Sequence, residues 1–341
     1  MQVTRIRTAR ATEGEATRLR GWWDGANDHA RLLLAVAAAV LAALLALGLA
    51  GCGAQGAGGS QGETGSASSG ADGKVKVVTS FYVMEDFAEK VGGDNVEVVN
   101  LVPAGTEPHD WEPSATDMQK IQDSDLLVYN GAGMEHWVDD TLSSLGDKAP
   151  ASVAASDGIE LRGGDEPGET DPHVWLDPKL AKVELANIKD ALVKADPDHK
   201  DDYEANYEKY AAEFDQLDQE FAEKLSAAPN KTIVVSHEAF GYLADAYGLT
   251  QVAITGMDAE GEPDAQTMAQ IIDQVKASGV KYIFSEDLVS PKVAQQIADA
   301  TGAECVVLNP LEGLTDEQIA AGDDYVSVME SNLDELVKAL S

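Results

Sequence analysis

Basic residues and cysteine are both scarce in this 341-residue sequence. Lysine and arginine together number 24 against 60 aspartate and glutamate residues, which gives a formal net charge of −36. This balance argues against nucleic acid as a partner, because a phosphate backbone requires basic patches. The acidity suits either the attraction of cations or simple solubility. There are two cysteines: Cys52 follows an apolar run, and Cys305 lies within a strand-like run. Because their settings differ so much, we expect no disulfide between them.

One long apolar run, residues 32–50, follows Arg31 and leads to Leu-Ala-Gly-Cys52. Small residues before a cysteine fit a secretory signal that is cleaved ahead of a lipid-modified Cys52, and these four residues resemble the lipobox of bacterial lipoproteins. The run is also long enough to be a retained transmembrane helix. We expect cleavage, with residues 1–51 as the targeting segment and residues 52–73 as the lipidated cysteine and a flexible Gly/Ser-rich tether. The protein would then be extracytoplasmic and anchored to the cell membrane by lipid.

Eight strand-like runs alternate with helical patterns in the rest of the chain. They are residues 75–79, 96–99, 126–129, 152–154, 232–235, 251–254, 282–284 and 305–308. Strands that alternate with helices predict parallel sheets with helices on both faces. The sequence therefore belongs to the α/β class.

A single segment, residues 198–226, interrupts this alternation. It contains no glycine or proline, and its aromatic and leucine residues recur at three- and four-residue steps to give one apolar stripe. It separates the first four strands from the last four. We predict two lobes, each with a mostly parallel four-stranded sheet flanked by helices, at 74–196 and 229–341, joined by one long rigid helix at 197–228. The alternative is an ordinary surface helix of one large domain.

Three of the six histidines lie in tight local frames just after, or at the end of, β-rich runs. They are His109 in Glu-Pro-His-Asp-Trp, His173 in Asp-Pro-His-Val-Trp and His237 in Ser-His-Glu, and Glu312 holds a fourth such position. A lone histidine is more often structural, but imidazole is also the commonest protein ligand for transition metals. Open α/β sheets bind ligands at the carboxyl ends of their strands. With two of these residues in each predicted lobe, we expect a cation to bind in the cleft between the lobes.

The longer motifs around these histidines resemble those of the zinc-binding lipoproteins that serve ABC importers, substrate-binding proteins of the zinc/manganese class. They are Glu-Pro-His-Asp-Trp-Glu-Pro-Ser, Asp-Pro-His-Val-Trp-Leu-Asp-Pro and Ser-His-Glu-Ala-Phe-Gly-Tyr-Leu. The resemblance runs from about Lys74 to the C-terminus. It implies two α/β lobes bridged by a rigid helix, metal ligation by all three histidines, and an ABC transporter permease and its ATPase as partners. Many relatives have Asp-Pro-Leu where this chain has Asn309-Pro-Leu-Glu312. Some relatives with Asn-Pro-Leu-Glu use the glutamate, so the resemblance implies Glu312 as the fourth ligand, with Asn309 or water as alternatives.

Three imidazoles and one carboxylate suit Zn²⁺ in tetrahedral geometry. Manganese-class relatives carry a glutamate in place of the third histidine, so His237 favours zinc, while manganese or another divalent metal stays an alternative. Ligating imidazoles usually donate their other N–H to an acceptor, for which Glu107, Glu238 and Glu286 are candidates. His136 is a further residue that could border the site.

These observations predict a monomeric binding protein that captures Zn²⁺ and delivers it for uptake, and not an enzyme. A zinc-dependent hydrolase is one alternative, because zinc with an open position activates water. The sequence lacks the His-Glu-x-x-His pattern of many such enzymes. A lipid-anchored surface adhesin is another alternative, since acidity and anchoring suit it equally.

Overall fold

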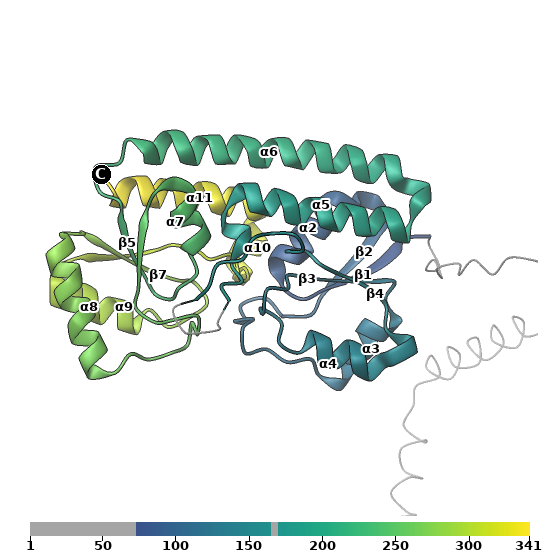
Figure 1. Cartoon of the computed structure of the whole chain (residues 1–341), viewed down its shortest axis with the longest axis horizontal. Helices are drawn as coiled ribbons and strands as arrows, with labels where there is room; N and C mark the ends of the chain where they lie inside the picture. Colours follow the sequence, from purple (N-terminus) through teal and green to yellow (C-terminus); the bar gives the residue numbers. More distant parts are fainter. Residues whose placement is uncertain (1–72, 165–169) are drawn as a thin grey trace, which may run out of the picture. The chain divides into compact units, whose positions relative to one another are not determined.

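The computed structural model describes residues 73–164 and 170–341, which belong to one compact unit spanning residues 65–341 (Figure 1). The predicted targeting segment, Cys52 and nearly all of the tether lie outside the described residues. Among the helices that are described, none combines the length and the apolar character needed to cross a membrane.

The N-terminal lobe is built on a four-stranded parallel sheet in the order β2-β1-β3-β4. Its strands are β1 (Val75–Thr79), β2 (Val96–Asn100), β3 (Leu126–Tyr129) and β4 (Ala151–Ala154). Its helices are α2 (Tyr82–Gly92), α3 (Ala115–Asp123), α4 (Val138–Leu145) and α5 (Pro178–Ala195), with short 3₁₀ turns η1 (Gly93–Asn95), η2 (Gly146–Lys148), η3 (Val174–Leu176) and η4 (Pro197–His199). Figure 1 shows α2 and α5 on one face of the sheet and α3 and α4 on the other. The central strands are valine- and leucine-rich because both of their faces are covered.

The C-terminal lobe repeats this plan with the order β6-β5-β7-β8, again all parallel. Its strands are β5 (Thr232–Val235), β6 (Thr250–Ala253), β7 (Tyr282–Ser285) and β8 (Glu304–Val307). Its helices are α7 (Gly241–Tyr247), α8 (Ala265–Ser278), α9 (Lys292–Thr301), α10 (Asp316–Ala321) and α11 (Tyr325–Ala339). The predicted fold class of two four-stranded parallel sheets flanked by helices is confirmed.

The long helix α6 (Lys200–Ser226) has 27 residues and spans about 40 Å. It packs against α2 and α5 of the first lobe and against α7 and α11 of the second. Its buried stripe includes Tyr203, Phe214 and Phe221, which join one apolar core that contains residues of both lobes. A continuous core beneath one long helix holds the lobes firmly, because any relative movement would expose packed apolar surface.

Candidate metal centre

Four loops that follow strands bring the four predicted ligands together. His109 lies between β2 and α3, and His173 lies between β4 and α5, immediately before η3. His237 follows β5, and Glu312 follows β8. Because parallel strands end at one edge of each sheet, two side chains from each lobe can face a common point.

The ligand-type atoms of these four residues converge. Glu312 Oε1 lies 3.2 Å from His109 Nε2, 3.1 Å from His173 Nε2 and 3.1 Å from His237 Nε2. His173 Nε2 is 3.2 Å from the Nε2 of His109 and 3.3 Å from that of His237. All four atoms lie within 4.8 Å of one another. Zinc–ligand bonds of about 2.0–2.1 Å in a tetrahedron require ligand atoms about 3.3 Å apart, so this arrangement fits a small four-coordinate cation.

Three of the four side chains are fully enclosed. His173 and His237 are 0% exposed and Glu312 is 2% exposed, whereas 16% of the His109 side chain reaches solvent. The site therefore opens to water at His109. A ligand set buried on three sides can strip a cation of its hydration shell while leaving one route for entry.

The buried carboxylate and imidazoles of the site shift one another's pKa values. Burial alone raises the pKa of the Glu312 carboxyl, but the surrounding imidazoles outweigh it and hold that pKa well below its usual range. Burial alone lowers the pKa of His173, yet its bonds to Asp171 and Glu312 raise it overall. The pKa of His237 is raised well above its usual value in the same way, by Glu312 and Glu286 against the effect of burial. Protons and a cation therefore compete for the same nitrogens.

Two carboxylates fix the buried imidazoles from behind. Glu286 Oε1 accepts from His237 Nδ1 at 2.8 Å and from the His237 backbone N–H at 3.2 Å, in the place predicted for it. Asp171 Oδ1 does the same for His173, at 2.9 Å from Nδ1 and 3.0 Å from the backbone nitrogen. These bonds keep each Nε2 lone pair directed at the centre. Asp171 was not among the predicted acceptors, although its position two residues before His173 could have indicated it.

The other polar candidates take different places. Glu107 accepts from the backbone N–H of His109 at 2.9 Å, and thus fixes the loop and not the ring. Glu238 is buried next to His237 in sequence, and its backbone N–H donates to the Gly256 carbonyl. The exposed His136 pairs with Glu112 at 3.3 Å and is not part of the converging group found among the described residues.

The loop that carries Glu312 is held by Asn309, whose amide bonds to the backbone of the loop and to a neighbouring carboxylate. Its Oδ1 accepts from the Leu311 N–H at 2.6 Å, and its Nδ2 donates to Asp287 at 2.8 Å. Leu311 has a φ of +63°, a region that disfavours a branched apolar side chain, and it is fully buried. The Asn309 bond and the packing of Leu311 together fix this strained turn, which aims Glu312 at the three imidazoles.

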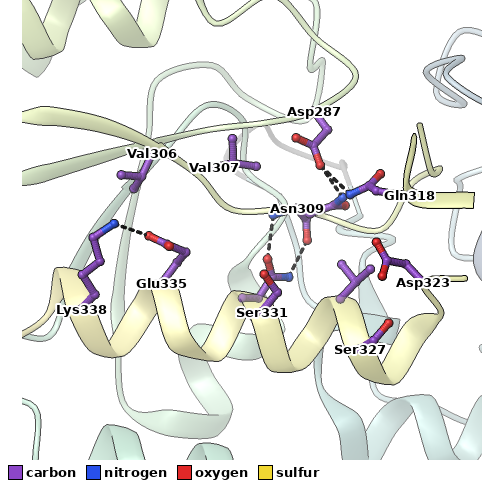
Figure 2. Close-up of a pocket in the computed structure, with 12 residues that line it drawn as sticks. Asp287, Val306, Val307, Asn309, Gln318, Asp323, Ser327, Ser331, Glu335 and Lys338 are labelled. Atoms are coloured by element: carbon purple, nitrogen blue, oxygen red, sulfur yellow. Dashed lines mark hydrogen bonds and ion pairs between the residues drawn. The ribbon is translucent and has the colours of Figure 1, made fainter. Parts of the chain in front are cut away.

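Behind this loop, a pocket of about 460 Å³ separates β8 from α11. Figure 2 shows Asn309 at its centre, bonded on one side to Asp287 and on the other to α11. The contact to α11 is made by Asn332, which receives the Asn309 N–H and donates to its carbonyl. The pocket has a mixed polar and apolar lining and contains no member of the converging group. Its residues Asp287 and Asn332 support the loop through their bonds to Asn309.

Comparison with known proteins yields matches to a family model, to individual relatives and to solved structures. The family model described as zinc-uptake complex component A, periplasmic (ZnuA), matches residues 77–339. The high-affinity zinc uptake system protein ZnuA of Bacillus subtilis strain 168 is 41% identical over 280 residues, which cover 78% of this chain and 88% of that protein. The zinc-binding lipoprotein AdcA of Streptococcus pneumoniae strain R6 is 42% identical over 276 residues, but the match covers only 55% of AdcA. The crystal structure of the Zn(II)-bound ZnuA-like domain of that AdcA superposes with a TM-score of 0.71 at 41% identity, covering 79% of this chain and 99% of the domain.

Proposed function

The chain belongs to the family of the periplasmic zinc-uptake component ZnuA, and on that basis we propose that it captures Zn²⁺ with His109, His173, His237 and Glu312. Proteins of this family are binding components of zinc uptake and not enzymes. The observation that carries the ligand assignment is the convergence of three Nε2 atoms and one carboxylate oxygen, with five of their six separations at 3.1–3.3 Å and all within 4.8 Å. Zinc is preferred to manganese because three imidazoles are softer ligands than the oxygen-rich sets that manganese favours.

Capture follows from the properties of these residues. The imidazoles must lose their protons before they can ligate, and Asp171 and Glu286 hold the remaining N–H on Nδ1 so that each Nε2 is available. Glu312 balances part of the cation's charge in a site that is open to water only at His109. If Glu312 completes a four-coordinate shell, no open position remains for an activated water, which argues against a hydrolase.

Delivery and anchoring complete the proposal. We propose that the loaded protein acts as a monomer outside the cytoplasm, anchored through lipid on Cys52, and passes its ion to an ABC permease driven by an ATPase. Family membership and the Leu-Ala-Gly-Cys52 segment support this proposal.

Metal analysis of the full protein, purified without chelator, tests the proposal. We expect one zinc per chain, and we expect His109→Ala to lower zinc affinity strongly in a chelator competition. His136→Ala is the matched control, because His136 is an exposed histidine of the N-terminal lobe outside the converging group. Zinc-free protein that takes up no added zinc, or equal effects of the two substitutions, would overturn the assignment.

A further inference from the structure

Arg162 is the only arginine after Arg31 in the sequence, and its side chain lies where the two lobes meet. Its Nη1 pairs with Asp245 on α7 of the C-terminal lobe. Its Nε lies 3.3 Å from Oδ2 of Asp171 in the N-terminal lobe, a charge–charge contact without the alignment of a hydrogen bond. One guanidinium thus contacts carboxylates from both lobes.

The Asp171 carboxylate leads directly to the metal centre. Its other oxygen, Oδ1, is the one that accepts from His173 Nδ1 at 2.9 Å. Asp171 is 1% exposed, so a positive charge beside its second oxygen is not replaced by water. An unbroken series of contacts therefore runs from His173 through Asp171 and Arg162 to α7.

Helix α7 makes a second contact with the segment that carries Arg162 and Asp171. The hydroxyl of Tyr242 donates to the Asp171 carbonyl at 2.9 Å and accepts from the Arg162 N–H at 2.9 Å. Next to it, Gly241 allows α7 to approach closely, because a Cβ there would lie 2.6 Å from both Arg162 Nε and Asp171 Oδ2. The geometry at α7 is thus shaped around the Arg162–Asp171 pair.

We propose that Arg162 is a positioning residue that ties Asp171, and through it His173, to the C-terminal lobe, so that the grip on the ion depends on the two lobes staying together. The inference rests on the proposed zinc capture. Lysine is a poor replacement for arginine here, because its ammonium is a compact point charge and lacks the planar fork with which the guanidinium faces Asp245 through Nη1 and Asp171 through Nε. Loss of this connection should accelerate the release of bound zinc.

The test compares zinc release from the full protein with Arg162→Gln, Arg162→Lys and a control, using a chelator chase and the melting temperature of metal-free protein. We expect Arg162→Gln to release zinc about tenfold faster, with no rescue by Arg162→Lys. The control is Lys182→Gln, because Lys182 pairs with Asp215 at exposures of 32% and 59%, close to the 30% and 69% of Arg162 and Asp245. The control should keep the wild-type release rate. If Lys182→Gln and Arg162→Gln lower the melting temperature equally but only Arg162→Gln accelerates zinc release, lost stability does not explain the faster release.

A double-mutant comparison shows whether Arg162 acts through Asp171. In an Asp171→Asn background, Arg162→Gln should cause little further loss of zinc affinity, because the carboxylate it positions is gone. Should Arg162→Gln fold poorly, the exposed Asp245→Asn variant carries the test and should also accelerate release. Wild-type release rates in these variants would overturn the inference while leaving zinc capture intact. So would fully additive effects of Arg162→Gln and Asp171→Asn on zinc affinity. A wild-type protein that binds no zinc would instead overturn the proposed function.

Discussion

Glu312 and Glu184 are both completely buried carboxyl groups, yet their surroundings are opposite. Glu312 is 2% exposed and has three imidazole nitrogens within 3.2 Å. Glu184, on α5, is 0% exposed, and neither of its oxygens accepts a hydrogen bond from any residue that the structure describes. The pKa of Glu312 is held well below its usual range by the imidazoles, whereas burial, aided by the charge of Glu135, raises the pKa of Glu184 well above it.

Burial is common to both groups, so it is the partners that decide the charge. An ionised carboxylate without partners in a protein core costs far more than a neutral acid, and burial therefore shifts the Glu184 pKa upward, towards the protonated form. Glu312 keeps its negative charge because three cationic or donor groups surround it. A strongly shifted pKa alone does not mark a binding site; convergence of complementary groups does.

Glu312→Gln is expected to produce the largest effect on zinc binding. Apparent zinc affinities of four-ligand sites are about 10–16 kcal/mol, so replacing one charged ligand by a neutral amide should cost about 3 kcal/mol, or more than 100-fold in affinity. Competition with a calibrated chelator measures the loss. Glu184→Gln, which removes a buried carboxylic acid outside the converging group, should leave zinc affinity unchanged; equal losses in the two variants would show that the comparison is wrong.

Glu286→Gln tests a carboxylate that does not face the ion but is hydrogen-bonded to the proposed ligand His237. The substitution keeps the side-chain shape but weakens the acceptor for His237 Nδ1, so we expect a loss of about 10–100-fold in zinc affinity. Isothermal titration would give the value. Glu107→Gln is the matched control, since the Glu107 carboxylate accepts from the backbone N–H of His109 and of Asp110 and not from an imidazole, and its effect should be smaller.

The four converging residues and the sheets could be predicted from sequence because their determinants are local motifs and runs. Valine-rich runs predict β1 and β5, and the apolar stripe of 198–226 predicts α6. The histidine motifs indicated the metal centre, and family resemblance assigned Glu312 its role. In contrast, the contact of Arg162 with Asp245 joins residues far apart in the chain, and only the folded structure brings them together. Glu107 shows a further limit, because proximity in sequence to His109 did not reveal whether its carboxylate would meet the ring or the backbone.

Glu184 should also leave a signature in the pH dependence of stability. Its pKa is raised above the ordinary 4.5, so the folded protein binds more protons than the unfolded chain above that pH. Stability should therefore fall as pH rises from 4.5 towards the folded-state pKa, by about 1.4 kcal/mol per pH unit from this group. Denaturant unfolding of metal-free protein at several pH values should show a flatter profile for Glu184→Gln. An unchanged slope would mean that Glu184 has a partner that stabilises its charge.

The smallest effect is expected for a cluster in which one lysine pairs with a buried acid and with a partly exposed acid. Lys90 on α2 pairs with Asp86 at 2.8 Å and with Asp324, at the start of α11 in the other lobe, at 2.7 Å. Burial raises the pKa of Asp86 to about 6 even though Lys90 opposes the shift, so this cluster is intermediate between Glu312 and Glu184.

Asp324→Asn keeps an oxygen to cap α11 but removes one charge. Because the Asp324 side chain is 41% exposed, the cost should be only about 0.5–1 kcal/mol of unfolding free energy. Glu335→Gln, which removes an exposed ion pair with Lys338 on the same helix, serves as the control and should stay within error of wild type. A cost for Asp324→Asn of several kcal/mol would show that the Lys90 pair between the lobes is as strongly desolvated as the metal centre.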